Sequence, residues 1–231
     1  MNNDMLIAGV IGFAPAMILM FWTLRDYTYP KVEKPFFEDK KAFGLFAVGM
    51  VLGVAIYAAQ SWVPLQVIYF ALLFAIVEEL VKLMILNFPR FQRKLDTSFY
   101  GLAIGLGIGS TMGFGAAFVA LHFVESVSAW TLLIVVLLAF QFVLLNASTG
   151  ATIGVGVTRG APWAFFAQAT LVHIACNLLM IPLYMNPDTL GYAGFFVALA
   201  IVVGYYVHVH MRMLPKVVED GISMFVSKAK S

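Results

Sequence analysis

Two glutamates and a lysine interrupt an apolar stretch of this chain. In AIVEELVKLMIL, residues 75–86, aliphatic side chains surround Glu78, Glu79 and Lys82. One charged side chain at the centre of a membrane helix costs about 2.5–3.5 kcal/mol on insertion scales, so three ionisable groups so close together indicate a functional site. A carboxylate held in such surroundings is suited to act as a general base, which takes a proton from water.

An ion pair would explain part of this pattern on structural grounds alone. Glu78 and Lys82 are four residues apart, the spacing at which two side chains meet on one face of a helix. Glu79 then lies about 100° further round the helix and outside this pair. It is either protonated, or it faces a group that pairs with an anion or gives a proton to a base. Because adjacent carboxylates repel one another, we expect their protons to dissociate in separate steps. The sequence leaves open which glutamate is the base.

Other polar residues are expected at the depth of the glutamates. At 1.5 Å rise per residue, the glutamates lie about 15–17 Å from the loop after their helix, and Asn146 and His173 lie about 20–21 Å from the loop between theirs. His173 and Asn177 are four residues apart on one helix face, so both could point at one substrate carbonyl. The alternative for His173 is a packing residue with a hydrogen-bonded ring.

The composition places these residues in a membrane protein. Hydrophobic residues make up 62% of the 231 positions and charged residues 11%, and the mean hydropathy is +0.92. About a quarter of a soluble domain would be charged. A helix that crosses a bilayer needs about 20 mostly apolar residues. We therefore expect an all-α, polytopic protein of the cell membrane, with residues 1–231 in one membrane domain of about seven transmembrane helices. The expected spans are Met5–Leu24, Ala42–Ala59, Leu65–Asn87, Thr97–Leu121, Trp130–Val157, Trp163–Tyr184 and Tyr192–His210.

The basic residues predict the orientation of the chain. If the segment from Arg25 to Lys41 is cytoplasmic, all Lys and Arg residues face the cytoplasm except Lys82. The positive-inside rule then predicts an outer N-terminus and a cytoplasmic C-terminus. Anionic lipids of the inner leaflet are the expected partners of these loops, and a net charge of +2 gives no reason to expect a nucleic-acid partner. The tail, residues 214–231, is expected to be a short amphipathic helix on the cytoplasmic surface.

Several stretches of the sequence resemble the PrsW family of intramembrane proteases. They are FAPAMILMFWTLRDYTYPKVEKPFF near the N-terminus, the EELVK motif, DTSFYGLAIGLGIG after the third expected span, and the late HIACN. The family shares a superfamily with the CAAX-processing and bacteriocin-processing endopeptidases and with the Aph subunit of γ-secretase. The resemblance implies that Glu78 and Glu79 match the paired glutamates of the family, Lys82 the base that follows them and His173 the late histidine.

The resemblance also implies roles, and it shows two departures. In the CAAX-processing relatives, an EExxxR, FxxxH, HxxxN pattern supplies a carboxylate that activates water and a His/Asn pair that stabilises the oxyanion. His173 and Asn177 match the last element, whereas Phe142 and Asn146 match the middle one with Asn in place of His. A glutamate that PrsW-like proteins tend to carry in the fourth span falls on Met112.

These departures favour a reaction without a metal. A catalytic zinc needs three protein ligands, and the membrane layer offers one histidine and two vicinal glutamates, which chelate poorly together. We therefore expect no cofactor, and zinc only with unusual ligands. In the metal-free scheme one glutamate takes a proton from water, His173 and Asn177 bind the oxyanion, and Asn146 orients the water.

Two functions of different classes fit these residues. The first is an intramembrane peptidase that cuts membrane-anchored proteins. The second is a catalytically silent scaffold that, like the Aph subunit, holds a partner's transmembrane helix. The departures at Met112 and Asn146 favour the scaffold, whereas the buried charges and the His/Asn pair favour the peptidase. A proton-coupled transporter would also use buried Glu and Lys, but the sequence contains no inverted repeat or paired broken helices.

Overall fold

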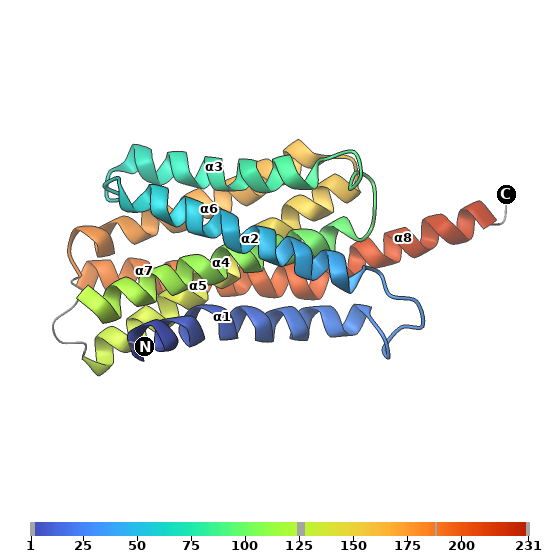
Figure 1. Ribbon diagram of the computed structural model, residues 1–231. Coiled ribbons are helices and arrows are strands. Elements are labelled where there is room, and N and C mark those ends of the chain that lie inside the picture. Colours follow the sequence, from blue (N-terminus) through green and yellow to red (C-terminus); the bar gives the residue numbers. More distant parts are fainter. Residues whose placement is uncertain (1–2, 124–127, 188, 230–231) are drawn as a thin grey trace.

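The computed structural model is a bundle of long helices (Figure 1). It describes residues 3–123, 128–187 and 189–229, and in these ranges it contains no strand, which confirms the predicted all-α fold. The elements of the described ranges are α1 (Asn3–Leu24), η1 (Arg25–Tyr27), α2 (Asp39–Ser61), α3 (Ile68–Leu86), α4 (Thr97–Phe123), α5 (Ala129–Thr158), α6 (Pro162–Met185), α7 (Thr189–His208), the π-helical turn η2 (Val209–Met213) and α8 (Leu214–Ala229).

Six helical segments within the described ranges are long and apolar enough to cross a membrane. They are α1 with η1, α2, α4, α5, α6, and α7 with its continuation through η2 into α8. Six such helices indicate a multi-pass membrane protein. The third expected span, Leu65–Asn87, corresponds to α3. This helix has 19 residues, but it is not among the six apolar segments because it carries three charged residues, Glu78, Glu79 and Lys82.

Helix α4 lies at the centre of the bundle, against α1, α2 and α5. Its residues from Thr97 to Gly113 are all buried. Glycines make the contact with α5 close: a Cβ atom added at Gly105 would collide with the backbone oxygen of Asn146. Close packing at small residues is a common way for membrane helices to associate, because it brings the two backbones into van der Waals contact. Helix α4 thereby fixes the position of α5, which carries Asn146 and Thr149.

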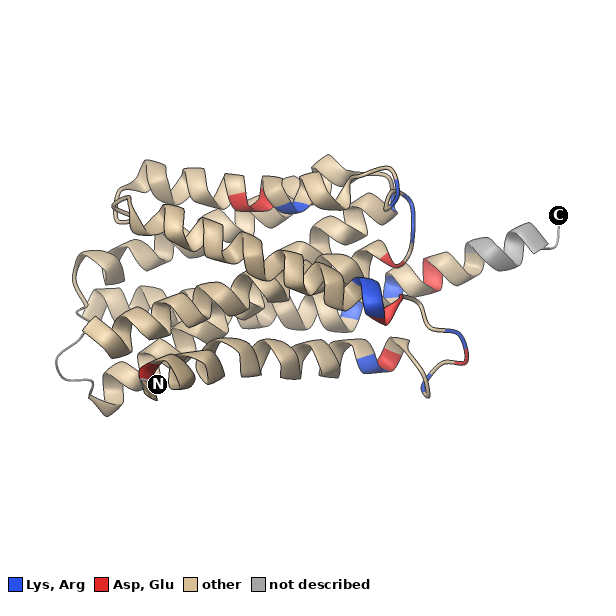
Figure 2. Cartoon of the chain, in the orientation of Figure 1, with Lys and Arg blue, Asp and Glu red and all other residues tan. Residues whose placement is uncertain are grey.

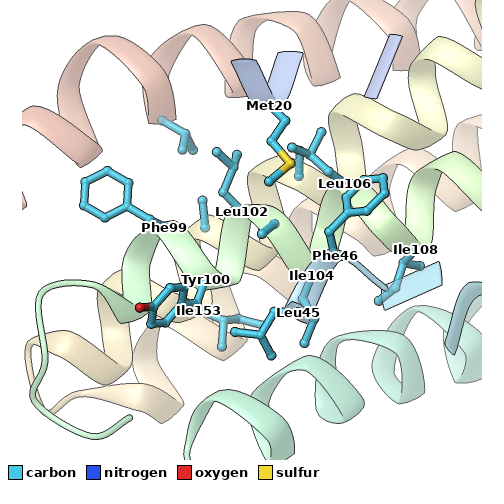
Figure 3. Close-up of a cluster of buried hydrophobic side chains, with 14 of the residues drawn as sticks. Met20, Leu45, Phe46, Phe99, Tyr100, Leu102, Ile104, Leu106, Ile108 and Ile153 are labelled. Atoms are coloured by element: carbon cyan, nitrogen blue, oxygen red, sulfur yellow. The ribbon is translucent and has the colours of Figure 1, made fainter. Parts of the chain in front are cut away.

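Large apolar side chains fill the space around α4 nearer to its N-terminal end (Figure 3). Phe99, Leu102 and Leu106 of α4 meet Met20 of α1 and Phe46 of α2, and all five belong to one buried cluster. Packing of this kind holds membrane helices together through van der Waals contact. The same cluster includes Leu86 of α3 and Cys176 of α6, so it also connects these two helices to the centre of the bundle.

Charged residues gather at one end of the bundle (Figure 2). At this end, named the basic end below, α1 ends, α2 begins, α3 and α4 are connected, α5 and α6 are connected, and α8 projects. Among the described Lys and Arg residues, Lys82 is the one that lies inside the bundle, in the second half of α3 beside the two glutamates. The predicted orientation requires this separation of charge along the bundle.

Candidate active site

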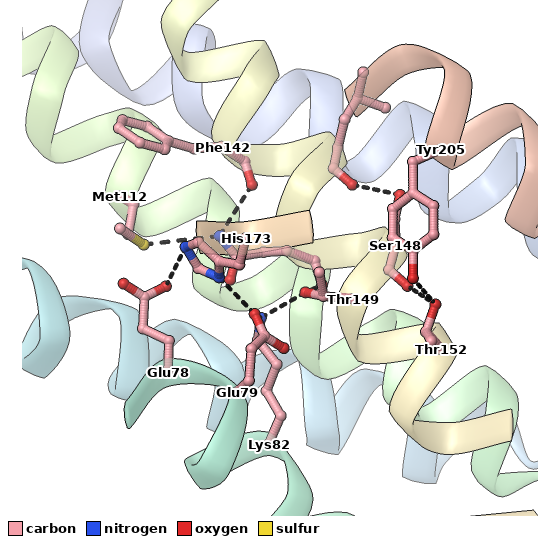
Figure 4. A network of polar contacts seen from close by, with 12 residues as sticks. Glu78, Glu79, Lys82, Met112, Phe142, Ser148, Thr149, Thr152, His173 and Tyr205 are labelled. Atoms are coloured by element: carbon pink, nitrogen blue, oxygen red, sulfur yellow. Dashed lines mark hydrogen bonds and ion pairs between the residues drawn. The ribbon is translucent and has the colours of Figure 1, made fainter. Parts of the chain in front are cut away.

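Helices α3, α5 and α6 bring the predicted site residues together (Figure 4). Helix α3 packs against α6, and both contact α5. The side chains of Glu78, Glu79 and Lys82 are completely buried, and His173 is 3% exposed. The predicted layer of polar residues inside the bundle is therefore present, and its ionisable side chains are buried.

Glu79 is the centre of a hydrogen-bond network that joins these three helices. Its Oε1 atom accepts a hydrogen bond from Lys82 Nζ at 2.7 Å and lies 2.6 Å from His173 Nδ1. Lys82 Nζ also donates to Thr149 Oγ1 of α5 at 2.8 Å. An ionised carboxylate can only accept, so His173 Nδ1 carries the hydrogen of its bond to Glu79. Glu79 therefore fixes both the orientation and the tautomer of the imidazole.

The prediction from sequence spacing that Glu78 pairs with Lys82 is wrong. Lys82 reaches the carboxylate three residues before it, not the one four residues before it. The reason lies in the neighbouring helices, because Thr149 offers Lys82 a second acceptor on the side of Glu79. Glu78 has a different partner, Gln60 of α2, whose Nε2 donates to Glu78 Oε1 at 2.6 Å.

The second carboxylate oxygen of Glu78 faces the opposite nitrogen of His173. Glu78 Oε2 lies 3.7 Å from His173 Nε2, which is too far for a direct hydrogen bond, and it has no hydrogen-bond partner among the described residues. The two glutamates thus flank one imidazole, with one carboxylate at each ring nitrogen. Only the carboxylate of Glu79 is bonded directly to the ring.

The charges of this cluster balance in two ways. In the first arrangement the carboxylates of Glu78 and Glu79 are balanced by two cations, Lys82 and a protonated His173. In the second, one proton has moved from His173 Nε2 to Glu78, so that Glu79 and Lys82 alone are charged. Neither arrangement has a net charge. Because an uncompensated charge is costly in a buried apolar site, both arrangements keep Glu79 ionised opposite Lys82. They differ in the place of one proton, which is the property that general acid–base catalysis requires.

A cavity of about 190 Å³ distinguishes the two glutamates. Glu78, His173, Asn177 and Asn146 all line it, whereas Glu79 and Lys82 do not. Its wall continues to residues at the ends of α2 and α6 that lie away from the basic end, including Ser61 and Tyr184. A molecule in the cavity would contact Glu78, while Glu79 acts on it only through His173. Of the two glutamates, Glu78 is therefore the one placed to exchange a proton directly with a molecule in the cavity.

The two predicted amide side chains both reach the cavity and are partly engaged. Asn177 Nδ2 donates to the backbone oxygen of Ala71 at 3.0 Å, which ties α6 to α3 and leaves one amide hydrogen for a ligand. Asn146 Nδ2 donates to the backbone oxygen of Phe142 at 3.1 Å, and Asn146 Oδ1 has no partner in the described part of the chain. Asn146 is therefore suited to accept a hydrogen bond from water, and Asn177 to donate one to an oxyanion.

Met112 and Asn146 lie side by side in the cavity wall. Asn146 Nδ2 is 3.9 Å from Met112 Sδ, and both residues line the cavity. They are the two positions at which the chain departs from the proteins that it resembles: the CAAX-processing relatives have a histidine at the position of Asn146, and PrsW-like proteins tend to have a glutamate at that of Met112. Both replacements are neutral, and the two side chains touch, so neither departure leaves an unpaired charge in the cavity wall. Glu78 and His173 line the same cavity.

Gln60 is the site residue that the sequence did not reveal. It lies near the end of α2, is 8% exposed and lines the cavity beside Glu78. The only sequence signal was one amide in the apolar segment YAAQSW, with no motif around it. Gln60 holds one oxygen of Glu78 and leaves the other to face His173, so it is a positioning residue for the carboxylate.

Replacing Gln60 with leucine is expected to lower stability by about 1–3 kcal/mol, because the buried Glu78 Oε1 would lose the one donor that it has among the described residues. Any activity that depends on Glu78 should also fall, by about tenfold for each 1.4 kcal/mol that the change adds to the activation free energy. Thermal unfolding in detergent and the rate of peptide cleavage measure the two effects. Gln141→Leu is the control, since Gln141 is buried on α5 and its Oε1 has no partner among the described residues. Equal effects of both substitutions would argue against a positioning role for Gln60.

No three His, Cys, Asp or Glu side chains of the described residues are arranged to hold one metal ion. Glu79 Oε1 is shared between Lys82 and His173, whereas Glu79 Oε2 and Glu78 Oε2 have no hydrogen-bond partner among the described residues. That the protein works without zinc stays a prediction, and the effect of a chelator on activity tests it.

Comparisons of the chain with models of protein families, with curated proteins and with solved structures gave no match. The PrsW-like assignment therefore stays a prediction that rests on the quoted stretches of sequence.

Proposed function

We propose that the chain is a PrsW-like intramembrane peptidase in which Glu78 activates water and His173 stabilises the oxyanion. The observation that carries this proposal is that the two ring nitrogens of His173 face different glutamates. Its Nε2 edge faces Glu78 beside the cavity, while Glu79 holds its Nδ1 edge from behind. An imidazole oriented by one carboxylate and opposed by another is an arrangement suited to acid–base chemistry.

The proposed reaction uses groups of this chain alone. Glu78 Oε2 takes a proton from water, whose oxygen attacks the carbonyl carbon of the substrate peptide. His173 Nε2–H and the remaining amide hydrogen of Asn177 donate to the oxygen that becomes negatively charged. Asn146 Oδ1 accepts the other hydrogen of the water and so orients it. When the C–N bond breaks, Glu78 returns its proton to the leaving amine, and the products are a carboxylic acid and an amine.

The proposal includes seven membrane spans in the cell membrane, with the N-terminus outside and the C-terminus in the cytoplasm. As a seventh span, α3 would measure about 28 Å at 1.5 Å per residue, close to the thickness of the bilayer core. Its charged residues face the bundle, and its exposed residues are apolar, including Tyr69, Leu73 and Met84. The positive-inside rule favours a cytoplasmic basic end. The cavity would then be reached from the outer half of the membrane.

A catalytically silent scaffold is the second candidate, and the neutral pair of Met112 and Asn146 favours it. In that case the cluster of Glu79, Lys82 and His173 would serve to fix α3, α5 and α6, and the cavity would receive part of a partner's transmembrane helix. The two candidates differ in one measurable respect, since only the peptidase breaks a bond.

The test is cleavage of a panel of single-span membrane proteins by the purified protein in lipid nanodiscs, with and without a zinc chelator. We expect cleavage by the wild type and a loss of about 10²–10³ in rate for His173→Ala, because alanine has no side-chain donor for the oxyanion. Cleavage that continues in the presence of the chelator supports the metal-free scheme, and cleavage that the chelator abolishes refutes that scheme. A panel left uncut, together with capture of one member intact by the wild type but not by His173→Ala, would decide for the scaffold.

A further inference from the structure

A second and larger cavity lies at the basic end of the bundle, apart from the candidate active site. It has a volume of about 900 Å³ and lies between the connection from α3 to α4, the end of α5 and the first half of α8. The residues that give it its chemical character are Phe36, Arg93, Lys94, Leu95, Arg159 and Val217. It therefore has both a basic wall and an apolar wall.

The acidic residues around this cavity do not neutralise all of its basic side chains, so basic groups remain for a ligand. Arg159 Nη2 is bonded to Asp220 Oδ2 of α8 at 2.8 Å. The other acidic residue of the wall, Asp96, lies within electrostatic reach of Lys41 and Lys94. Arg93 has no ion pair or hydrogen bond from its side chain to the described residues. Three basic and two acidic residues line the cavity, so its net charge is positive.

The backbone that carries Arg93 and Lys94 is held in place by the end of α5. Arg93 has a φ of 54°, in the left-handed region, and its N–H donates to the backbone oxygen of Val157 at 3.3 Å. The hydroxyl of Thr158 donates to the backbone oxygen of Lys94 at 2.8 Å. A non-glycine residue in this conformation costs about 1–3 kcal/mol and is found preferentially at functional sites. These bonds fix the two basic residues at the rim of the cavity.

The apolar wall matches the other half of an amphipathic ligand. Leu95 and Phe36 are half-buried, and Val217 of α8 is 3% exposed. In the proposed orientation this end of the bundle lies at the inner surface of the membrane, where anionic lipids create a negative potential. Guanidinium and ammonium groups bind phosphate oxygens strongly, and apolar side chains beside them suit the first carbons of an acyl chain.

We propose that this cavity binds an anionic phospholipid of the inner leaflet, with its phosphate on Arg93 and Lys94 and its glycerol and upper acyl carbons against Leu95 and Val217. A lipid in this position fills the space under α8 and adds to the contact that Arg159 and Asp220 make with that helix. The binding site is independent of the proposed peptidase activity, since it shares no residue with the candidate active site.

The experiment measures thermal unfolding of the full chain in detergent with phosphatidylglycerol, with phosphatidylcholine or with soluble glycerol 3-phosphate. Phosphatidylglycerol should raise the unfolding midpoint of the wild type by about 2–8 °C, since a ligand of the folded state stabilises it. The double variant Arg93→Gln, Lys94→Gln should lose this shift, measured from its own midpoint without lipid. The matched control, Lys34→Gln with Lys40→Gln, removes the same charge from exposed residues that do not line the cavity, and it should keep the shift.

Four results would overturn the proposal. They are no shift with phosphatidylglycerol, an equal shift with phosphatidylcholine, an equal shift with glycerol 3-phosphate, and an equal loss of the shift in the control variant. The third result would mean that the cavity takes a free phosphate ester, and the fourth that the basic end attracts anionic lipid through its charge alone.

Discussion

Glu78→Gln is expected to reduce peptide cleavage by about 10²–10⁴, the range that a positioned general base contributes. The amide has nearly the shape of the carboxylate, and its oxygen can still accept the hydrogen bond from Gln60. It cannot take a proton from water. The loss should therefore appear in the rate of the chemical step and not in the amount of folded protein. The measurement is single-turnover cleavage of the best substrate of the panel by wild type and variant.

The informative comparison for Glu78→Gln is Glu79→Gln. Because Glu79 does not line the cavity and is bonded to Lys82 and His173, its amide variant should lose stability as well as activity. If Glu78→Gln cleaves at the wild-type rate while Glu79→Gln is folded and inactive, the base is Glu79 and the assignment made from the cavity is wrong.

Lys82→Met is expected to destabilise the protein by about 3–5 kcal/mol, the cost of leaving one partner of a buried ion pair without compensation. Lys82 is fully buried, and its two acceptors are Glu79 Oε1 and Thr149 Oγ1. Methionine has a similar length and no charge, so it fills much of the same space. The measurement is the free energy of unfolding in mixed micelles, or the unfolding midpoint where unfolding is irreversible.

A double variant separates the charge from the packing in this prediction. Lys82→Met with Glu79→Gln removes both charges, so it should recover much of the stability lost in Lys82→Met. A double variant that is less stable than either single one would show that the hydrogen bonds to Thr149 and His173, and not charge balance, hold the cluster. Lys41→Met serves as the control, because its ion pair with Glu38 is exposed and worth at most about 1 kcal/mol.

The sequence predicted which residues meet in the bundle better than how they are bonded. Depth along the helices brought Glu78, Asn146, His173 and Asn177 into one layer, and the structure places all four around one cavity. This worked because rise per residue is the same in every α-helix. The same reasoning could not show that Asn177 is tied to the backbone of Ala71, since that contact depends on how α3 and α6 are packed.

The partners of the two glutamates could not be predicted for a different reason. Spacings of three and four residues both place side chains on one helix face, so the neighbouring helices decide between them. Thr149 and His173, which draw Lys82 and the imidazole to Glu79, lie 67 and 94 residues further along the chain from their partners. Gln60 was missed because a single amide in an apolar helix has no pattern around it.

The end of the last membrane helix was predicted at His210, whereas the structure continues it. Helix α7 passes through the π-helical turn Val209–Met213 directly into α8. The prediction ended the helix where polar residues increase, but Leu214 and Val217 are buried against the body and carry the helix onward. The predicted helical tail is present over Leu214–Ala229, and residues 230 and 231 lie outside the described ranges.

The network around Glu79 also has a consequence for how the protein is made. A ribosome completes α3 long before it reaches Thr149 or His173, so the nascent chain holds Lys82 and Glu79 without two of the groups that bind them in the finished protein. Of the bonds to the three charged residues of α3, only those within α3 and from Gln60 can form at that stage. We therefore expect α3 to take its final place only after α5 and α6 have been made.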